Sequence, residues 1–229
     1  MKDVEELKNQ FKIVITGNYE RKTLTHIITP LLIIIFFGSM AVSWIIYPNY
    51  NWTIMNISYL GSPYRNPFGW IFFSIGMTIT GFTFIIIVPY VHRRLVSIHK
   101  IAFIGTFFFY IAIIGIIGVG AIPQLNLEIF KLIHFINAIL ALGGFYLCLG
   151  FYGICLLLEK KIRNDKLLIP FTILGWFAPI GTIITQVIRF SLSIPDNSIL
   201  ILNFSVWEWL LLYCIFVDLI LLIFILREE

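Results

Sequence analysis

Residues 26–47 read HIITPLLIIIFFGSMAVSWIIY, an almost unbroken apolar run that begins at His26 and ends at Tyr47. A transmembrane helix needs about 20 such residues to cross the hydrocarbon core of a bilayer. The run does not alternate between apolar and polar residues, as a strand of a membrane barrel would. It therefore predicts a helix that spans a membrane.

Five further runs of the same kind follow, at residues 69–91, 101–122, 133–158, 167–190 and 206–226. An unpaired backbone group is costly in lipid, so each run is expected to be helical. The chain of 229 residues is 59% hydrophobic and only 12% charged, whereas soluble domains carry about 25% charged residues. This composition excludes a soluble enzyme, a nucleic-acid binder and a disordered tail. The predicted fold class is all-α, with residues 23–229 forming one six-helix antiparallel transmembrane bundle.

The basic residues predict the orientation of this bundle. All but three of the 16 lysines and arginines lie before the first run, after the second, after the fourth or in the C-terminal tail. The three exceptions are Arg65, Lys131 and Arg189. By the positive-inside rule, both termini are predicted to be cytoplasmic. The connections expected at 92–100 and 159–166 are short, which favours antiparallel packing of the helices that they join.

Residues 1–22 form a separate segment before the first run. Val4, Leu7, Phe11 and Val14 share one face of a helix, and Gly17 is expected to end it. The preferred interpretation is an amphipathic helix that lies on the inner leaflet. A loosely ordered tail is the alternative.

The cysteines and histidines predict no metal site. Cys148, Cys155 and Cys214 all lie inside apolar runs, without metal-ligand spacing, and their odd number argues against a disulfide framework. We interpret them as small buried apolar residues. The four histidines also lack ligand spacing. No metal, cofactor or nucleic-acid partner is therefore expected.

Polar side chains gather at the predicted extracytoplasmic end of several runs. They are Arg65, Asn66, His134, Asn137, Gln186, Arg189 and Glu208. Polar residues within membrane segments are costly, so they suggest a functional site. We expect a polar cup in which Glu208 faces Arg189 or His134, and which binds a lipid head group or a small ligand. The alternative is that these side chains simply lie in the hydrated head-group region.

Asp218 lies deeper in the last run. It follows Glu208 by ten residues, which places it about 15 Å further into the membrane. It is either a proton carrier or a neutral carboxyl that is hydrogen-bonded to a neighbouring helix. No second acidic residue shares its depth, which favours the second interpretation.

Three short stretches resemble one family of membrane proteins. They are Ile57–Pro63 (ISYLGSP) with Asn66-Pro67, Gly118–Pro123 (GVGAIP) followed by His134, and Trp207–Leu210 (WEWL). They resemble segments of the DRAM/Sfk/Frag family, and most closely those of its six-helix prokaryotic relatives of unassigned function. Tyr59 stands where eukaryotic members often carry an acidic residue. The resemblance implies residence in a membrane and a connection with lipids, but no particular reaction.

Three functions are consistent with these patterns. The favoured one is a non-catalytic membrane protein that binds lipid or a membrane partner through the cup. A membrane-protein partner or a homo-oligomer is the alternative to lipid alone. The second is an intramembrane lipid-modifying enzyme, with His134 and Glu208 as acid and base. The third is a small proton-linked transporter that uses Asp218. No catalytic motif is readable in the sequence, so we assign no catalytic residue.

Overall fold

The computed structural model describes residues 2–160, 162–195 and 198–226, and within these ranges it contains helices and no strands. Six helical segments in this part of the chain are long and apolar enough to cross a membrane. The first, Arg21–Ile46, joins α2 (Arg21–Thr23), a π-turn and α3 (Thr29–Ile46). The others are α4 (Trp70–Ile98), α5 (Ala102–Ala121), α6 (Glu128–Leu158), α7 (Leu168–Ser191) and α8 (Phe204–Ile225). For the described residues, the prediction of an all-α fold with six helices long and apolar enough to span a membrane is confirmed, and these helices indicate a multi-pass membrane protein.

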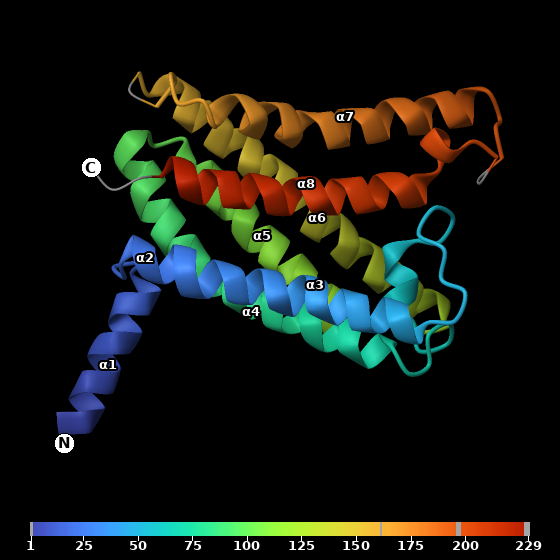
Figure 1. Ribbon diagram of the computed structural model, residues 1–229, viewed down its shortest axis with the longest axis horizontal. Coiled ribbons are helices and arrows are strands. Elements are labelled where there is room, and N and C mark those ends of the chain that lie inside the picture. Colours follow the sequence, from blue (N-terminus) through green and yellow to red (C-terminus); the bar gives the residue numbers. More distant parts are fainter. Residues whose placement is uncertain (1, 161, 196–197, 227–229) are drawn as a thin grey trace.

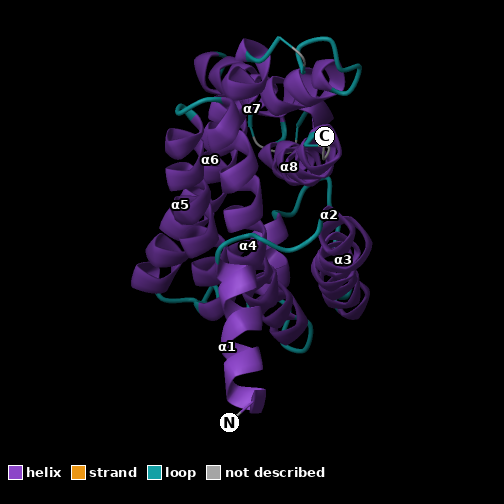
Figure 2. Cartoon of the chain, turned by 90° about the vertical axis from the view of Figure 1, so that its left-hand side faces the viewer, coloured by secondary structure: helices purple, strands orange, loops and turns teal. Residues whose placement is uncertain are grey.

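The six long helices lie side by side along the long axis of the molecule (Figure 1). Seen from the end, α7 and α8 lie on one side, and α3 and α4 lie on the opposite side (Figure 2). Helix α1 and the C-terminal end of α8 lie at the same end of the bundle (Figure 1). We call the opposite end, where residues 48–68 connect α3 to α4, the loop end.

Three helical segments extend five or more residues beyond the predicted runs, and the first of them begins at Arg21 rather than at residue 26. Helix α4 continues to Ile98 rather than ending at residue 91, and α6 begins at Glu128 rather than at residue 133. The expected connection at 92–100 is therefore wrong, because Arg93 and Arg94 belong to α4. Hydropathy locates the part of a helix that lies in lipid, whereas the backbone can remain helical into the aqueous interface. Residues 1, 161, 196–197 and 227–229 lie outside the described chain.

Helices α5 and α6 pack with their backbones in close approach. A Cβ at Gly115 of α5 would lie 2.3 Å from the backbone nitrogen of Ala141. A Cβ at Gly144 of α6 would lie 2.7 Å from the backbone nitrogen of Ala112. Small residues allow such approach between membrane helices, so these two glycines set the spacing of the pair.

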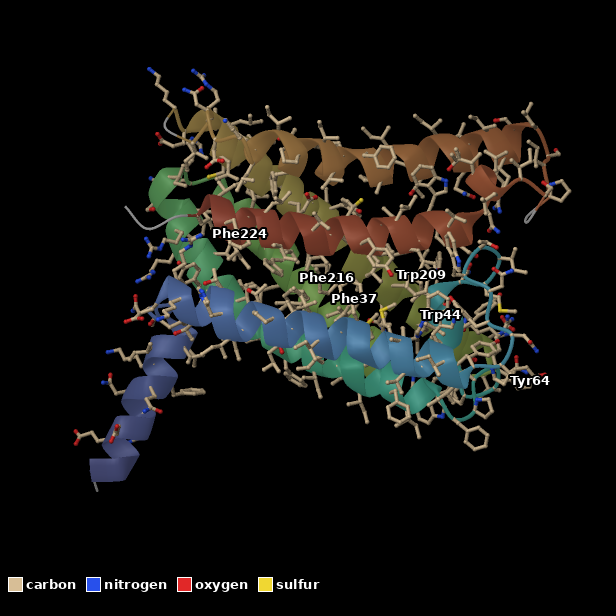
Figure 3. The ribbon with its side chains drawn as sticks, in the orientation of Figure 1. Phe37, Trp44, Tyr64, Trp209, Phe216 and Phe224 are labelled. Carbon is tan, nitrogen blue, oxygen red and sulfur yellow. The ribbon has the colours of Figure 1, made fainter. Side chains whose placement is uncertain are left out.

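Aromatic side chains fill the space between α3 and α8. Phe36 stacks on Phe216 with ring centroids 4.1 Å apart, and Trp44 lies near Trp209 at 5.7 Å. Figure 3 shows Phe37 and Phe216 meeting between the two helices. Large rings thus join helices whose backbones are further apart than those of α5 and α6.

Helix α1 (Lys2–Ile15) extends away from the bundle (Figure 1). It is followed by Gly17, which has a φ of +65° and lies against the backbone of Pro89, where a Cβ would be only 2.4 Å away. The side chain of Phe11 is exposed on this helix, whereas those of Val4 and Leu7 lie outside the described residues. The prediction that α1 lies on a membrane surface stays a prediction.

Candidate functional site

The loop of residues 48–68 folds back over the loop end and is held by Asn66. This asparagine is fully buried. Its Nδ2 donates to the Ser43 carbonyl and hydroxyl oxygens and to the Leu60 carbonyl, at 3.0–3.1 Å. Its Oδ1 accepts a hydrogen bond from the backbone N–H of Gly69. Asn66 therefore joins the end of α3 to the start of α4, and its hydrogen-bonding groups are occupied.

A buried tyrosine holds the first half of the same loop. The Tyr50 hydroxyl donates to the carbonyls of Met55 and Asn56, at 3.1 and 3.2 Å. Burial raises the pKa of Tyr50, and the nearby Glu208 carboxylate adds to the effect. The hydroxyl is therefore kept in its neutral, donating form.

Three contacts join this loop to the start of α8. The Asn203 side-chain amide donates to the Thr53 carbonyl, and the Ser205 hydroxyl donates to Asn56 Oδ1 at 2.7 Å. The backbone N–H of Ile57 donates to Glu208 Oε2 at 2.7 Å. Ile57 is the first residue of a short 3₁₀ helix, Ile57–Gly61, so the Glu208 carboxylate accepts an N–H that this helix leaves unpaired.

Beneath this 3₁₀ helix lies a cavity of about 50 Å³ between α4, α5, α6 and α8. Its walls are almost entirely apolar. They are formed by Ile57, Phe73, Met77, Ile116, Val119, Ala138, Ala141, Leu142, Phe145, Leu212, Ile215 and Phe216. The polar side chains that line it come from Ser58, His134 and Glu208. Two residues of the predicted cup thus converge on one apolar cavity.

His134, which lines this cavity, carries a hydrogen-bond acceptor at Nε2 that is free among the described residues. Its side chain is buried, and its Nδ1 lies 3.1 Å from the carbonyl oxygen of Ile122. A carbonyl can only accept, so Nδ1 carries the proton and Nε2 carries a lone pair when the ring is neutral. Nε2 is buried and has no hydrogen-bond partner within the described part of the chain.

The other predicted cup residues do not converge on the cavity. The Arg65 guanidinium lies over the Tyr59 ring at 3.5 Å, and Arg189 lies over Phe190 at 4.7 Å. Gln186 Nε2 donates to the Leu202 carbonyl at 3.4 Å. The Asn137 side chain packs on α5, where a Cβ at Gly118 would lie 2.4 Å from its Oδ1.

Of the two predicted partners of Glu208, His134 shares its cavity, whereas the expected contact with Arg189 is absent among the described side chains. Neither Ser58 nor the apolar wall is predictable from the sequence as part of the site. The apolar residues that line the cavity cannot be distinguished in the sequence from other apolar residues of the bundle. Ser58 belongs to the stretch Ile57–Pro63, which resembles the family, and this resemblance is the one feature of the sequence that points to it.

Asp218 does not belong to this cavity. It is fully buried in the middle of α8, with its carboxyl directed toward α7. The three cysteines are free and buried, as predicted. No group of three or more metal-ligating side chains was found in the described ranges.

The cavity at the loop end therefore offers hydrogen-bond acceptors within apolar walls. Glu208 supplies a carboxylate, and neutral His134 supplies a lone pair at Nε2. A molecule that satisfies both groups must donate hydrogen bonds, as a hydroxyl, an ammonium or water does. Comparison with protein-family models, curated proteins and solved structures found no match to this chain.

Proposed function

We propose that this membrane protein binds an amphipathic lipid whose polar end donates hydrogen bonds to Glu208 and His134. The apolar part of the ligand lies between α4, α5, α6 and α8. The proposal includes antiparallel neighbouring helices and cytoplasmic termini, because basic residues concentrate at the end that carries the termini. The loop end then faces the extracytoplasmic side. Membership of the DRAM/Sfk/Frag family stays a prediction that agrees with this lipid connection.

One observation carries this proposal: two acceptor side chains border a cavity whose other walls are apolar. His134 Nε2 is a buried acceptor without a donor among the described residues, which is costly and favours a ligand with a hydroxyl or ammonium group. Glu208 accepts from the Ile57 N–H and has a second carboxylate oxygen to offer. A volume of about 50 Å³ has room for a small polar end and a few carbon atoms. The rest of the lipid would extend between helices toward the bilayer.

Lipid analysis of the purified protein tests the proposal. Glu208→Gln removes the negative charge but retains an oxygen that accepts from the Ile57 N–H, so the loop keeps its anchor. Ala138→Leu fills the cavity without changing a polar group. Both variants should lose a lipid that co-purifies with the wild type. Glu128→Gln is the matched control, because Glu128 is exposed and pairs with Lys131.

The amount of bound lipid per protein is measured by extraction and mass spectrometry. A loss in Glu208→Gln and Ala138→Leu, but not in Glu128→Gln, supports the cavity as the binding site. The same lipid at the same ratio in all four proteins would show that the cavity binds none.

Because Glu208 and His134 border the same cavity, a lipid-modifying enzyme is the second candidate. General acid–base catalysis needs groups within about 3 Å of the reacting atoms, or one water between them. A water needs about 10–15 Å³, which this cavity exceeds. An enzyme would retain unconverted lipid in the Glu208→Gln variant, with a mass that differs from that of any lipid bound to the wild type. A pure binding protein would show no new lipid species.

A further inference from the structure

Asp218 is the most deeply buried carboxyl group of the described chain and has no hydrogen-bonding partner there. Its relative exposure is 0%, and neither Oδ1 nor Oδ2 receives a hydrogen bond from a described residue. An ionised carboxylate in such a place would be very costly. A neutral carboxyl has an O–H to donate, so it needs an acceptor instead.

The neighbouring helix α7 provides an unpaired acceptor at this position. In an α-helix the carbonyl of residue i accepts from the N–H of residue i+4. Residue 179 is a proline inside α7, so the Gly175 carbonyl lacks the N–H that would normally pair with it. A Cβ at Gly175 would lie 3.3 Å from Asp218 Oδ2. The carboxyl therefore lies beside Gly175, the residue whose carbonyl loses its usual partner to Pro179.

The other described groups around Asp218 supply no charge and no strong hydrogen-bond donor, since a thiol donates only weakly. The titratable groups that face it are Tyr146 of α6 and Cys214 of α8. The Tyr146 hydroxyl already donates to the Leu211 carbonyl at 2.7 Å. On α7, the Thr172 hydroxyl donates to the Leu168 carbonyl at 2.8 Å. No charged side chain of the described chain perturbs the Asp218 carboxyl.

We propose that Asp218 is a proton-binding site within the membrane, and that its O–H donates to the Gly175 carbonyl and thereby joins α8 to α7. This hydrogen bond replaces the one that Pro179 removes. Loss of the proton would leave a negative charge facing a carbonyl oxygen, and the two helices would separate.

Loss of this hydrogen bond would mainly affect α7, because few side chains of this helix are buried against the rest of the bundle. Of its 24 residues, all within the described ranges, only Leu168, Phe171, Ala178 and Thr185 are buried. A single hydrogen bond is therefore a larger part of the contact between α7 and α8 than it would be between α5 and α6. Protonation of Asp218 thus favours the docked position of α7.

A double-mutant cycle tests this bond. Pro179→Ala restores an N–H for the Gly175 carbonyl, so Asp218→Leu should destabilise the protein less in that background than in the wild type. We expect the two substitutions to be coupled by about five- to tenfold in the unfolding equilibrium constant, the worth of one buried hydrogen bond. Unfolding is followed in detergent through labelling of the buried Cys214 thiol. Strictly additive effects would overturn the proposal.

Asp218→Asn provides a second comparison with the leucine variant, and infrared spectra provide a measurement that does not depend on the leucine variant folding. Asp218→Asn retains an N–H donor and should keep most of the stability, whereas a loss as large as that of Asp218→Leu would contradict the bond. In infrared spectra at neutral pH, the wild type should show a protonated-carboxyl C=O band that Asp218→Asn lacks. This band should shift in Pro179→Ala, where the Gly175 carbonyl has another partner. Detection of only an ionised carboxylate at position 218 would refute the proposal.

Discussion

Two adjacent glycines in α6 should respond in opposite ways to the addition of one methyl group. At Gly144 a Cβ would lie 2.7 Å from the Ala112 nitrogen and 2.9 Å from both the Ala112 Cα and the Phe108 carbonyl oxygen. At Gly143 no atom lies within 4 Å of the Cβ position, apart from the neighbouring residues and the local backbone of α6 itself. Gly144→Ala therefore has to move the backbone of α5, whereas Gly143→Ala enters open space.

The expected change in the free energy of unfolding follows from two opposing effects. Replacing glycine by alanine in a helix interior favours the helix by about 1 kcal/mol, and both variants gain this. At position 144 the contact with the Ala112 nitrogen must lengthen from 2.7 Å to an ordinary 3.4 Å or more. Overpacking of this kind costs about 1–3 kcal/mol. We therefore expect Gly143→Ala to be neutral or stabilising, and Gly144→Ala to be less stable than Gly143→Ala by about 1–3 kcal/mol.

The assay is unfolding in detergent, measured by labelling of buried thiols. Cys148 lies one turn after Gly144 in α6 and is fully buried, so it reports separation of α5 from α6. The midpoint of labelling should fall in Gly144→Ala and not in Gly143→Ala. Equal stability of the two variants would refute the inference that close backbone contact sets the spacing of α5 and α6.

Two further predictions concern the loop of residues 48–68. Asn66→Asp should destabilise the protein by about 2–4 kcal/mol, because a carboxylate cannot donate to the three oxygens that Asn66 Nδ2 now contacts. Asn51→Asp is its control and should be nearly neutral in the same unfolding assay, since Asn51 is exposed and only its Oδ1 is used, as an acceptor from Thr53. Because burial raises the pKa of Tyr50 above its ordinary value of 10.0, its contribution to stability should be complete below pH 10 and decline above it. Tyr50→Phe should lose that contribution at lower pH and lack this part of the decline, and an identical pH profile in both proteins would contradict the role given to the hydroxyl.

The number of spanning helices could be predicted because the bilayer imposes a length on every apolar run. The helix ends could not be predicted in the same way. Arg93 and Arg94 mark where α4 leaves the hydrocarbon, yet the helix continues to Ile98. A charged side chain is unfavourable in lipid but is compatible with a helical backbone in water. Hydropathy and helix length are therefore separate properties at the interface.

The sequence predicts how deep in the membrane the polar side chains lie, but not which of them point into the cavity. Asn66 and Glu208 both lie at the loop end, as their positions near the ends of apolar runs predict. The structure uses Asn66 to pair backbone groups of the loop, whereas Glu208 also borders the cavity. Which side chain faces a cavity depends on helix rotation and on how a long loop folds back, and neither follows from spacing along the chain.

Glu208 and Asp218 show how one helix can place two carboxyl groups in opposite chemical settings. Glu208 faces a backbone N–H, the donor that an ionised carboxylate requires. Asp218 faces a turn whose carbonyl lacks a donor, and only a protonated carboxyl can pair with it. The two groups border different helices, so Glu208→Gln should leave the infrared band of Asp218 unchanged. A change in that band would mean that the loop-end cavity and the α7–α8 contact are coupled through α8.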